Sequence, residues 1–151
     1  MRLLTRQNAP MTERLPVYAA ALWWGSLSVI GFMAVPLLFA NLPSKALAGH
    51  AAAHLFAAQT WVSLACGLVL LLVYKQNRAL APAHPAQIAI VFVVFGMLLA
   101  LLLEYAVAPR IVARQNLRLW HSLGAALYVV QWLCAAVVLW PLAGRRGDTY
   151  P

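Results

Sequence analysis

Long stretches of apolar residues, separated by short polar segments, dominate this sequence. Four of them, at residues 17–39, 51–74, 87–108 and 119–142, are longer than the roughly 20 residues that a helix needs to cross a hydrocarbon core. The stretches are too long for strands, and backbone polar groups in lipid must be hydrogen-bonded within their own segment. The pattern therefore predicts an all-α protein, a polytopic membrane bundle of four transmembrane helices.

Residues that break or anchor helices fit these boundaries. Polar and proline-containing segments at residues 41–45 and 77–85 follow the first two stretches. Pro36 lies inside the first stretch, where we expect it to kink the last turns of the helix instead of ending it. Trp120 and Trp140 are separated by a helical rise of about 30 Å, so both can lie in the interfacial belts of the membrane.

The composition identifies lipid as the solvent for most of the surface. Hydrophobic residues make up 64% of the chain and charged residues 9%, whereas about a quarter of the residues in soluble domains are charged. The net charge of +8 comes from basic residues scattered between apolar runs, with no basic and aromatic patch to follow a phosphate backbone. We expect a lipid bilayer as partner and no nucleic acid. Cys66 and Cys134 lie within apolar stretches, which favours two buried thiols over a disulfide.

The basic residues also predict the orientation. With the N-terminus inside, seven of the eleven Lys and Arg residues face the cytoplasm, which favours both termini there. We expect a cytoplasmic N-terminal segment at 1–14, a transmembrane domain at 15–142 and a cytoplasmic tail at 143–151, in a bacterial inner (plasma) membrane. The cytoplasmic basic residues are Arg2, Arg6, Arg14, Lys75, Arg78, Arg145 and Arg146, and the others are Lys45, Arg110, Arg114 and Arg118.

A faint internal repeat relates the two halves of the chain. The first stretch closes on Ala34, Val35 and Pro36, and the third closes on Val107, Ala108 and Pro109; His54 and His121 then open the second and fourth stretches. Two hairpins of the same orientation would be related by an axis along the membrane normal, as in parallel-repeat transporters. Chance similarity in an Ala- and Val-rich sequence is the alternative.

Ionisable residues gather at one end of the predicted bundle. On this topology, His50, His54, Glu104, Arg110 and His121 lie near the non-cytoplasmic face, with Gln59 about one turn deeper. Glu104 is an acid inside a span, where an unpaired charge is costly. We expect it to face the bundle and to pair with Arg110, His121 or water; the favoured interpretation is a structural ion pair that ties the third helix to the fourth. A proton relay or a ligand site is the alternative.

The spacing of two histidines raises the possibility of a metal site. His50 and His54 are four residues apart and share a helical face, and Glu104 or His121 would complete three ligands for zinc or copper. Two interfacial histidines reaching the headgroups are the simpler interpretation.

Other polar and small residues are typical of helix packing. Gln131, Ser63 and Thr60 lie deeper in the spans, where they can form hydrogen bonds between helices worth about 1 kcal/mol each. Gly25 and Gly31 give the first helix positions for close approach by a neighbour.

Short motifs along most of the chain resemble a known family. They are Leu22-Trp23-Trp24-Gly25-Ser26, Val35-Pro36-Leu37-Leu38-Phe39, Ala48-Gly49, Leu55-Phe56, Ala108-Pro109-Arg110 and His121-Ser122. Between about residues 15 and 142 the chain is similar to domain of unknown function 4149, the family of transmembrane protein 205. The resemblance implies a four-helix membrane domain of undefined role, with a eukaryotic relative linked to platinum-drug resistance.

The same family is similar in layout to the copper-resistance protein D group and to the membrane protoporphyrinogen oxidase that binds haem through histidine. This implies a metal or haem role, with copper, zinc or haem as the cofactor, by analogy of fold, which does not by itself transfer function. His121 matches a histidine of the family pattern. His50 and His54 stand where the family is not expected to have histidine, which counts against a family-wide metal pair.

Three functions therefore compete. The favoured one is a non-enzymatic structural or accessory membrane protein, with a possible homo-oligomer or partner membrane protein. The second is a metal- or haem-binding protein that uses His54, His121 and Glu104, with His50 as an accessory ligand. The third is a small oligomeric transporter. We find no Ser/His/Asp or Cys/His constellation and no paired carboxylates in the sequence, which disfavours an enzyme.

Overall fold

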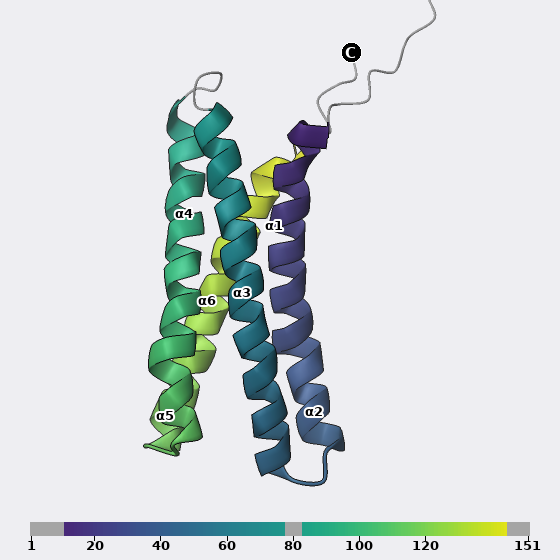
Figure 1. Cartoon of the computed structure of the whole chain (residues 1–151), viewed down its shortest axis with the longest axis vertical. Coiled ribbons are helices and arrows are strands. Elements are labelled where there is room, and N and C mark those ends of the chain that lie inside the picture. Colours follow the sequence, from purple (N-terminus) through teal and green to yellow (C-terminus); the bar gives the residue numbers. More distant parts are fainter. Residues whose placement is uncertain (1–10, 78–82, 145–151) are drawn as a thin grey trace, which may run out of the picture.

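Four long helices pack side by side in the computed structural model, which describes residues 11–77 and 83–144 (Figure 1). The spans that are long and apolar enough to cross a membrane are Arg14–Asn41, Lys45–Gln76, Gln87–Val112 and Leu117–Gly144. Each contains one of the predicted stretches and extends it by a few residues. The predicted all-α, four-span membrane protein is therefore confirmed.

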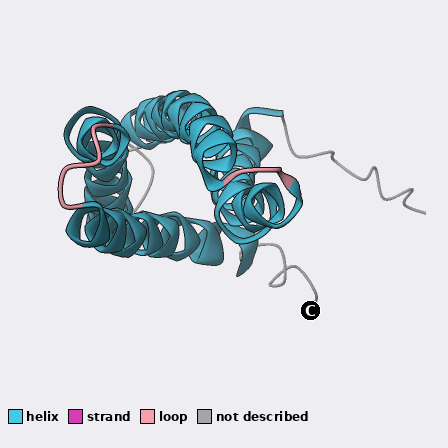
Figure 2. Cartoon of the chain, turned by 90° about the horizontal axis from the view of Figure 1, so that it is seen from below, coloured by secondary structure: helices cyan, strands magenta, loops and turns pink. Residues whose placement is uncertain are grey.

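The element order is that of two helical hairpins. The first comprises α1 (Met11–Val29), a π-helical turn η1 (Ile30–Ala34), α2 (Val35–Asn41) and α3 (Lys45–Asn77). The second comprises α4 (Ala83–Leu102), a π-helical turn η2 (Leu103–Val107), α5 (Ala108–Val112) and α6 (Leu117–Gly144). The α2–α3 and α5–α6 loops lie at the same end of the bundle, as Figure 1 and the view from below in Figure 2 both show. Arg2, Arg6, Arg78, Arg145 and Arg146, which contribute to the predicted orientation, lie outside the described residues.

Each helix packs on two neighbours, so that α1, α3, α4 and α6 surround a common core. Trp23 lies at its centre with no exposed surface. A Cβ atom added at Gly96 of α4 would approach the Trp23 ring to 2.7 Å, so the missing side chain at Gly96 makes room for the indole. The other buried apolar residues of the central cluster include Ala20, Leu27, Leu70, Val93, Ala135 and Val138.

Two π-helical turns interrupt the first and third spans at matching places. Each ends two residues before a proline, Pro36 in the first hairpin and Pro109 in the second. Pro36 was expected to kink the first helix without ending it. The helix instead widens into a π-turn before the proline, and α2 continues beyond it. In a π-turn the hydrogen bonds reach one residue further than in an α-helix, and such turns are frequent at functional sites.

The matching π-turns support the internal repeat in the predicted register of Pro36 and Pro109, which are 73 positions apart, but not the predicted pairing of His54 with His121. Phe56 and Tyr128 contact edge to face with ring centroids 5.3 Å apart, and Gln59 and Gln131 share the hydroxyl of Ser63. Both pairs are separated by 72 positions, close to the 73 that separate the first residues of the two π-turns. His54 and His121 are 67 positions apart and so are not equivalent in this register.

Candidate functional site

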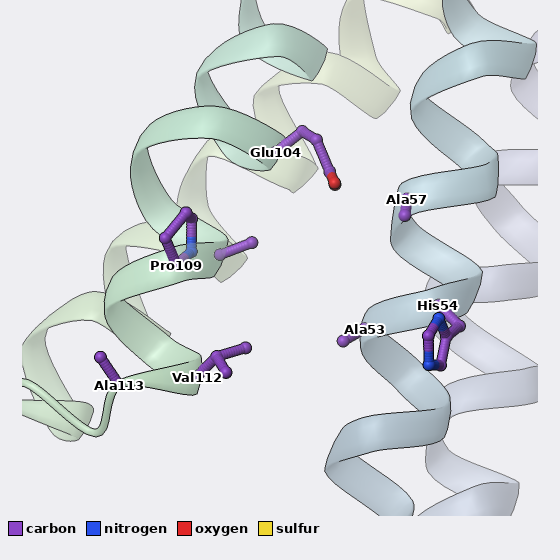
Figure 3. Close-up of a pocket in the computed structure, with 8 residues that line it drawn as sticks. Ala53, His54, Ala57, Glu104, Pro109, Val112 and Ala113 are labelled. Atoms are coloured by element: carbon purple, nitrogen blue, oxygen red, sulfur yellow. The ribbon is translucent and has the colours of Figure 1, made fainter.

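An open cleft of about 470 Å³ lies at the end of the bundle that carries the α2–α3 and α5–α6 loops. Ala53, His54 and Ala57 of α3 form one wall. The other wall comes from η2, α5 and the residue that follows, and Figure 3 shows the two walls facing each other. The residues of this second wall are Glu104, Ala108, Pro109, Val112 and Ala113.

The cleft exists because the two hairpins pack less closely here than along the rest of the bundle. α3 packs along α4, whereas it makes only slight contact with η2. Alanine side chains on both walls leave the remaining space open, since a methyl group cannot reach across it. The small residues therefore leave a cleft between the two hairpins at the loop end, whereas the hairpins pack closely in the middle of the bundle.

Glu104 belongs to η2, and its side chain is half-buried. Its carboxyl group points from the second hairpin into the cleft towards α3 (Figure 3). Within residues 11–77 and 83–144, this group has no hydrogen bond and no ion pair with another side chain. The expectation that Glu104 faces the inside of the bundle is met, but its counter-charge does not come from these residues.

Arg110 is engaged elsewhere. Its guanidinium group lies over the ring of Trp120, 4.5 Å from the centroid, and Arg110 Nη1 donates a hydrogen bond to the carbonyl oxygen of Ala106. The predicted ion pair of Glu104 with Arg110 or His121 is therefore not formed in the described part of the chain. A cation–π contact between α5 and α6 replaces it as a link between the third and fourth spans.

The predicted metal ligands are only partly brought together. His54 lines the cleft with Glu104, whereas His50 and His121 have exposed side chains that do not line it. Among the residues described, no group of three His, Cys, Asp or Glu side chains is close enough to hold a metal ion. One chain alone thus offers one carboxyl group that points into the cleft and one exposed imidazole at its edge, which falls short of the three protein ligands typical of zinc sites.

A second group of polar side chains lies in the core of the bundle. The Gln59 amide nitrogen donates to Ser26 Oγ at 3.0 Å and to Ser63 Oγ at 3.3 Å, and the Gln131 amide nitrogen donates to Ser63 Oγ at 3.1 Å. These contacts join α1, α3 and α6 in one network. They confirm the predicted interhelical role of Gln131 and Ser63, whereas the Thr60 hydroxyl donates to the Phe56 carbonyl of its own helix.

The network leaves one polar atom of Gln59 without a partner. Gln59 is 2% exposed, and its Oε1 atom accepts no hydrogen bond from the described residues. Exchanging the amide oxygen and nitrogen would let Oε1 accept from the Ser63 hydroxyl, since the Ser26 hydroxyl already donates to the Trp23 carbonyl, but would leave the NH₂ group unpaired instead. The indole N–H groups of Trp23 and Trp24 are likewise buried and have no hydrogen-bond acceptor among the described residues. Sequence reasoning placed Gln59 in the outer polar cluster, whereas its bonds are to this core network.

Two further links between α1 and α6 had no clear signal in the sequence. The Tyr128 hydroxyl donates to the carbonyl oxygen of Leu27 at 2.8 Å, and the Trp132 indole donates to Ser28 Oγ at 2.8 Å. The Leu27 carbonyl is the one that the Gly31 N–H would meet in a regular α-helix, so Tyr128 is bonded at the entrance to η1. A Cβ atom added at Gly31 would collide with the Tyr128 ring, which explains the glycine in this turn.

Comparison with protein families gives one match, to DUF4149, a domain of unknown function, over residues 18–119. The chain belongs to this family. The matched region holds both π-turns, α3 and all eight residues that line the cleft. Searches of curated proteins and of solved structures gave no match. Family membership thus agrees with an integral membrane protein of undefined biochemical role.

Proposed function

We propose that this member of the DUF4149 family is a non-enzymatic accessory protein of a bacterial inner membrane, with both termini in the cytoplasm. The observation that supports this role is the use of polar side chains in the core. Gln59, Gln131, Tyr128 and Trp132 all donate hydrogen bonds to another helix. These groups hold the bundle together, which leaves few of them for chemistry at a bound substrate.

Complementation of a deletion strain tests the accessory role, in any condition where loss of the gene gives a measurable phenotype. Glu104→Gln and His121→Asn should restore the phenotype to the level of the unmodified protein, because neither side chain holds the core together. Ser63→Ala should complement less well, because it weakens the bundle. Complete loss of complementation by Glu104→Gln, with unchanged amounts of folded protein in the membrane, would overturn this proposal.

A small oligomeric transporter is the second candidate, and the cleft is the observation that favours it. The cleft could form the mouth of a pathway, but the apolar cluster around Trp23 closes the centre of a single bundle. A continuous path would then have to run between two copies. Native mass spectrometry in mild detergent tests this candidate, which requires a dimer or a larger assembly and is refuted by a strictly monomeric protein.

The resemblance to transmembrane protein 205 and the copper-resistance protein D group motivates a metal or haem role, but the described residues of one chain contain no group of three His, Cys, Asp or Glu side chains that could hold a metal ion. Further ligands would have to come from a second copy or a partner. Elemental analysis for copper and zinc, together with a search for a Soret band in the purified protein, tests this hypothesis. Substoichiometric metal and no Soret band would eliminate it.

A further inference from the structure

We propose that the cleft between α3 and the η2–α5 segment binds an ammonium group carried on an apolar body, with Glu104 as its counter-ion. Glu104 is the single acidic side chain among the eight lining residues, and none of those residues is Lys or Arg. Its carboxyl group points into the cleft and has no partner within the described chain. A cation in the cleft would supply the missing charge.

The rest of the lining suits the apolar part of such a ligand. Apart from Glu104 and His54, the walls consist of alanine, proline and valine side chains. The volume of about 470 Å³ lies within the range of small-molecule sites, which combine mostly apolar walls with a few polar groups that fix the ligand's orientation. The methyl groups of Ala53 and Ala57 point into the cleft from α3, whereas the His54 ring lies on the side of α3 away from Glu104, so Glu104 supplies the hydrogen-bond acceptors for the ammonium group.

The placement of charge around the cleft selects a cation over an anion. Lys45, Arg114 and Arg118 lie at this end of the bundle but do not line the cleft, and the Arg110 guanidinium is held over Trp120. An anion that entered would meet the Glu104 carboxylate with no basic side chain beside it. An ammonium group would meet an opposite charge at a partly dehydrated position, where charge pairing is stronger than in water.

The same donor set disfavours a divalent metal as the guest. Calcium prefers six or more oxygen ligands, and magnesium requires a near-octahedral shell. One carboxyl group and one imidazole fall short of either requirement. An ammonium group needs only a counter-charge and one to three hydrogen-bond acceptors, which this cleft supplies.

Two sources can deliver the same group. Glu104 lies eight residues before Val112, the last residue of its span, and therefore about 12 Å from that end of the helix. The open end of the cleft would admit a free lipophilic amine from the aqueous side. The amine headgroup of a phospholipid such as phosphatidylethanolamine could reach the same position from the membrane.

The test uses the full chain in phosphatidylcholine nanodiscs. One arm titrates hexylamine, with hexanol and hexanoate as neutral and anionic probes of the same chain length, and follows the thermal unfolding midpoint. The second arm adds phosphatidylethanolamine to the nanodiscs and counts bound lipids by native mass spectrometry. We expect hexylamine or phosphatidylethanolamine to bind, and hexanol and hexanoate to bind at least about tenfold more weakly than hexylamine. Binding in only one arm identifies the source of the ammonium group.

Matched pairs of variants distinguish binding in the cleft from changes in net charge or side-chain size elsewhere in the protein. Glu104→Gln and Ala57→Leu should each weaken ammonium binding about tenfold or more, the first by removing the charge and the second by filling the cleft. Glu13→Gln, an equal change of net charge in α1, and Ala58→Leu, at an exposed neighbouring position, should bind as the unmodified protein does. Equal affinity of Glu104→Gln and the unmodified protein, or no ammonium binding in either arm, would overturn the proposal.

Discussion

Ser63 is the residue on which the core network converges. Its hydroxyl accepts a hydrogen bond from Gln59 of its own helix and another from Gln131 of α6. A hydroxyl with no exposed surface that serves two amides is hard to replace, because each buried N–H group left without an acceptor costs free energy. A single small side chain therefore connects the two hairpins in the middle of the bundle.

We expect Ser63→Ala to lower the free energy of unfolding by about 1–2 kcal/mol, because both amides lose their shared acceptor. Thr60→Val is the matched control on the same helix, since the Thr60 hydroxyl bonds only to the Phe56 carbonyl. It should change the stability by less than about 0.5 kcal/mol. Unfolding in mixed micelles with increasing sodium dodecyl sulfate measures both variants. Equal losses in the two would contradict the assigned role of Ser63.

Two glycines of the first span differ sharply in their surroundings. A Cβ atom at Gly31 would strike the Tyr128 ring, whereas a Cβ atom at Gly25 meets nothing within 4 Å. We expect Gly31→Ala to destabilise the bundle by about 1–3 kcal/mol through overpacking. Gly25→Ala should be neutral or slightly stabilising, because alanine favours the helix. The same unfolding assay compares them, and a stable Gly31→Ala variant would show that Tyr128 can move aside at little cost.

At the scale of the elements, two similar hairpins meet along two seams, α1 against α6 and α3 against α4. Trp23 crosses the centre from the first hairpin to Gly96 of the second. Helices in membranes associate by such close packing and by hydrogen bonds, since lipid provides no hydrophobic force between them. The two hairpins should therefore find each other even when they are separate chains.

The prediction is that fragments 1–80 and 81–151, produced together, co-purify from detergent-solubilised membranes. Gly96→Leu in the second fragment should reduce the recovery of the first at least severalfold, because the new side chain occupies the space of the Trp23 ring. Gly144→Leu is the matched control, since a Cβ atom there meets nothing within 4 Å. If Gly96→Leu leaves the recovery of the first fragment unchanged, the packing of Trp23 against Gly96 does not hold the two hairpins together.

The features set by the bilayer could be predicted from the sequence, whereas those set by packing between helices could not. The four spans could be predicted because the bilayer demands a minimum run of apolar residues. The π-turns could not, because a widened turn depends on local packing such as that of Tyr128 against Gly31. The engagement of Arg110 with Trp120 could not be predicted either, because it depends on how α5 and α6 pack beyond η2. Gln59 was expected in the outer polar cluster, and its bonds to Ser26 and Ser63 depend on which helices pack together, which the apolar pattern does not record.

At the scale of the whole molecule, the start of α1 and the end of α6 lie at one end of the bundle and the α2–α3 and α5–α6 loops at the other (Figure 1). The predicted orientation puts those loops, and hence the mouth of the cleft, outside the cytoplasm. This assignment decides which compartment a ligand of the cleft would come from.

Two exposed glutamines test this orientation. Gln115 lies beyond α5 at the loop end, and Gln76 lies near the end of α3 at the opposite end. In intact cells whose outer membrane has been permeabilised, Gln115→Cys should react with a membrane-impermeant maleimide and Gln76→Cys should not. The native Cys66 and Cys134 are buried free thiols and should stay unlabelled in both. The reverse labelling pattern would invert the topology and place the cleft on the cytoplasmic side.

The π-turn that carries Glu104 would allow the two parts of this span to rotate relative to each other about the helix axis. One residue corresponds to about 100° of rotation in an α-helix, so tightening η2 to ordinary α-helical geometry would turn the residues on its two sides relative to each other by about that angle. The carboxyl group would then swing from the cleft towards a neighbouring helix or the lipid while the span kept its length almost unchanged. Such a register shift, of the kind that proteins make in microseconds to milliseconds, would present or withdraw the charge without parting the two hairpins.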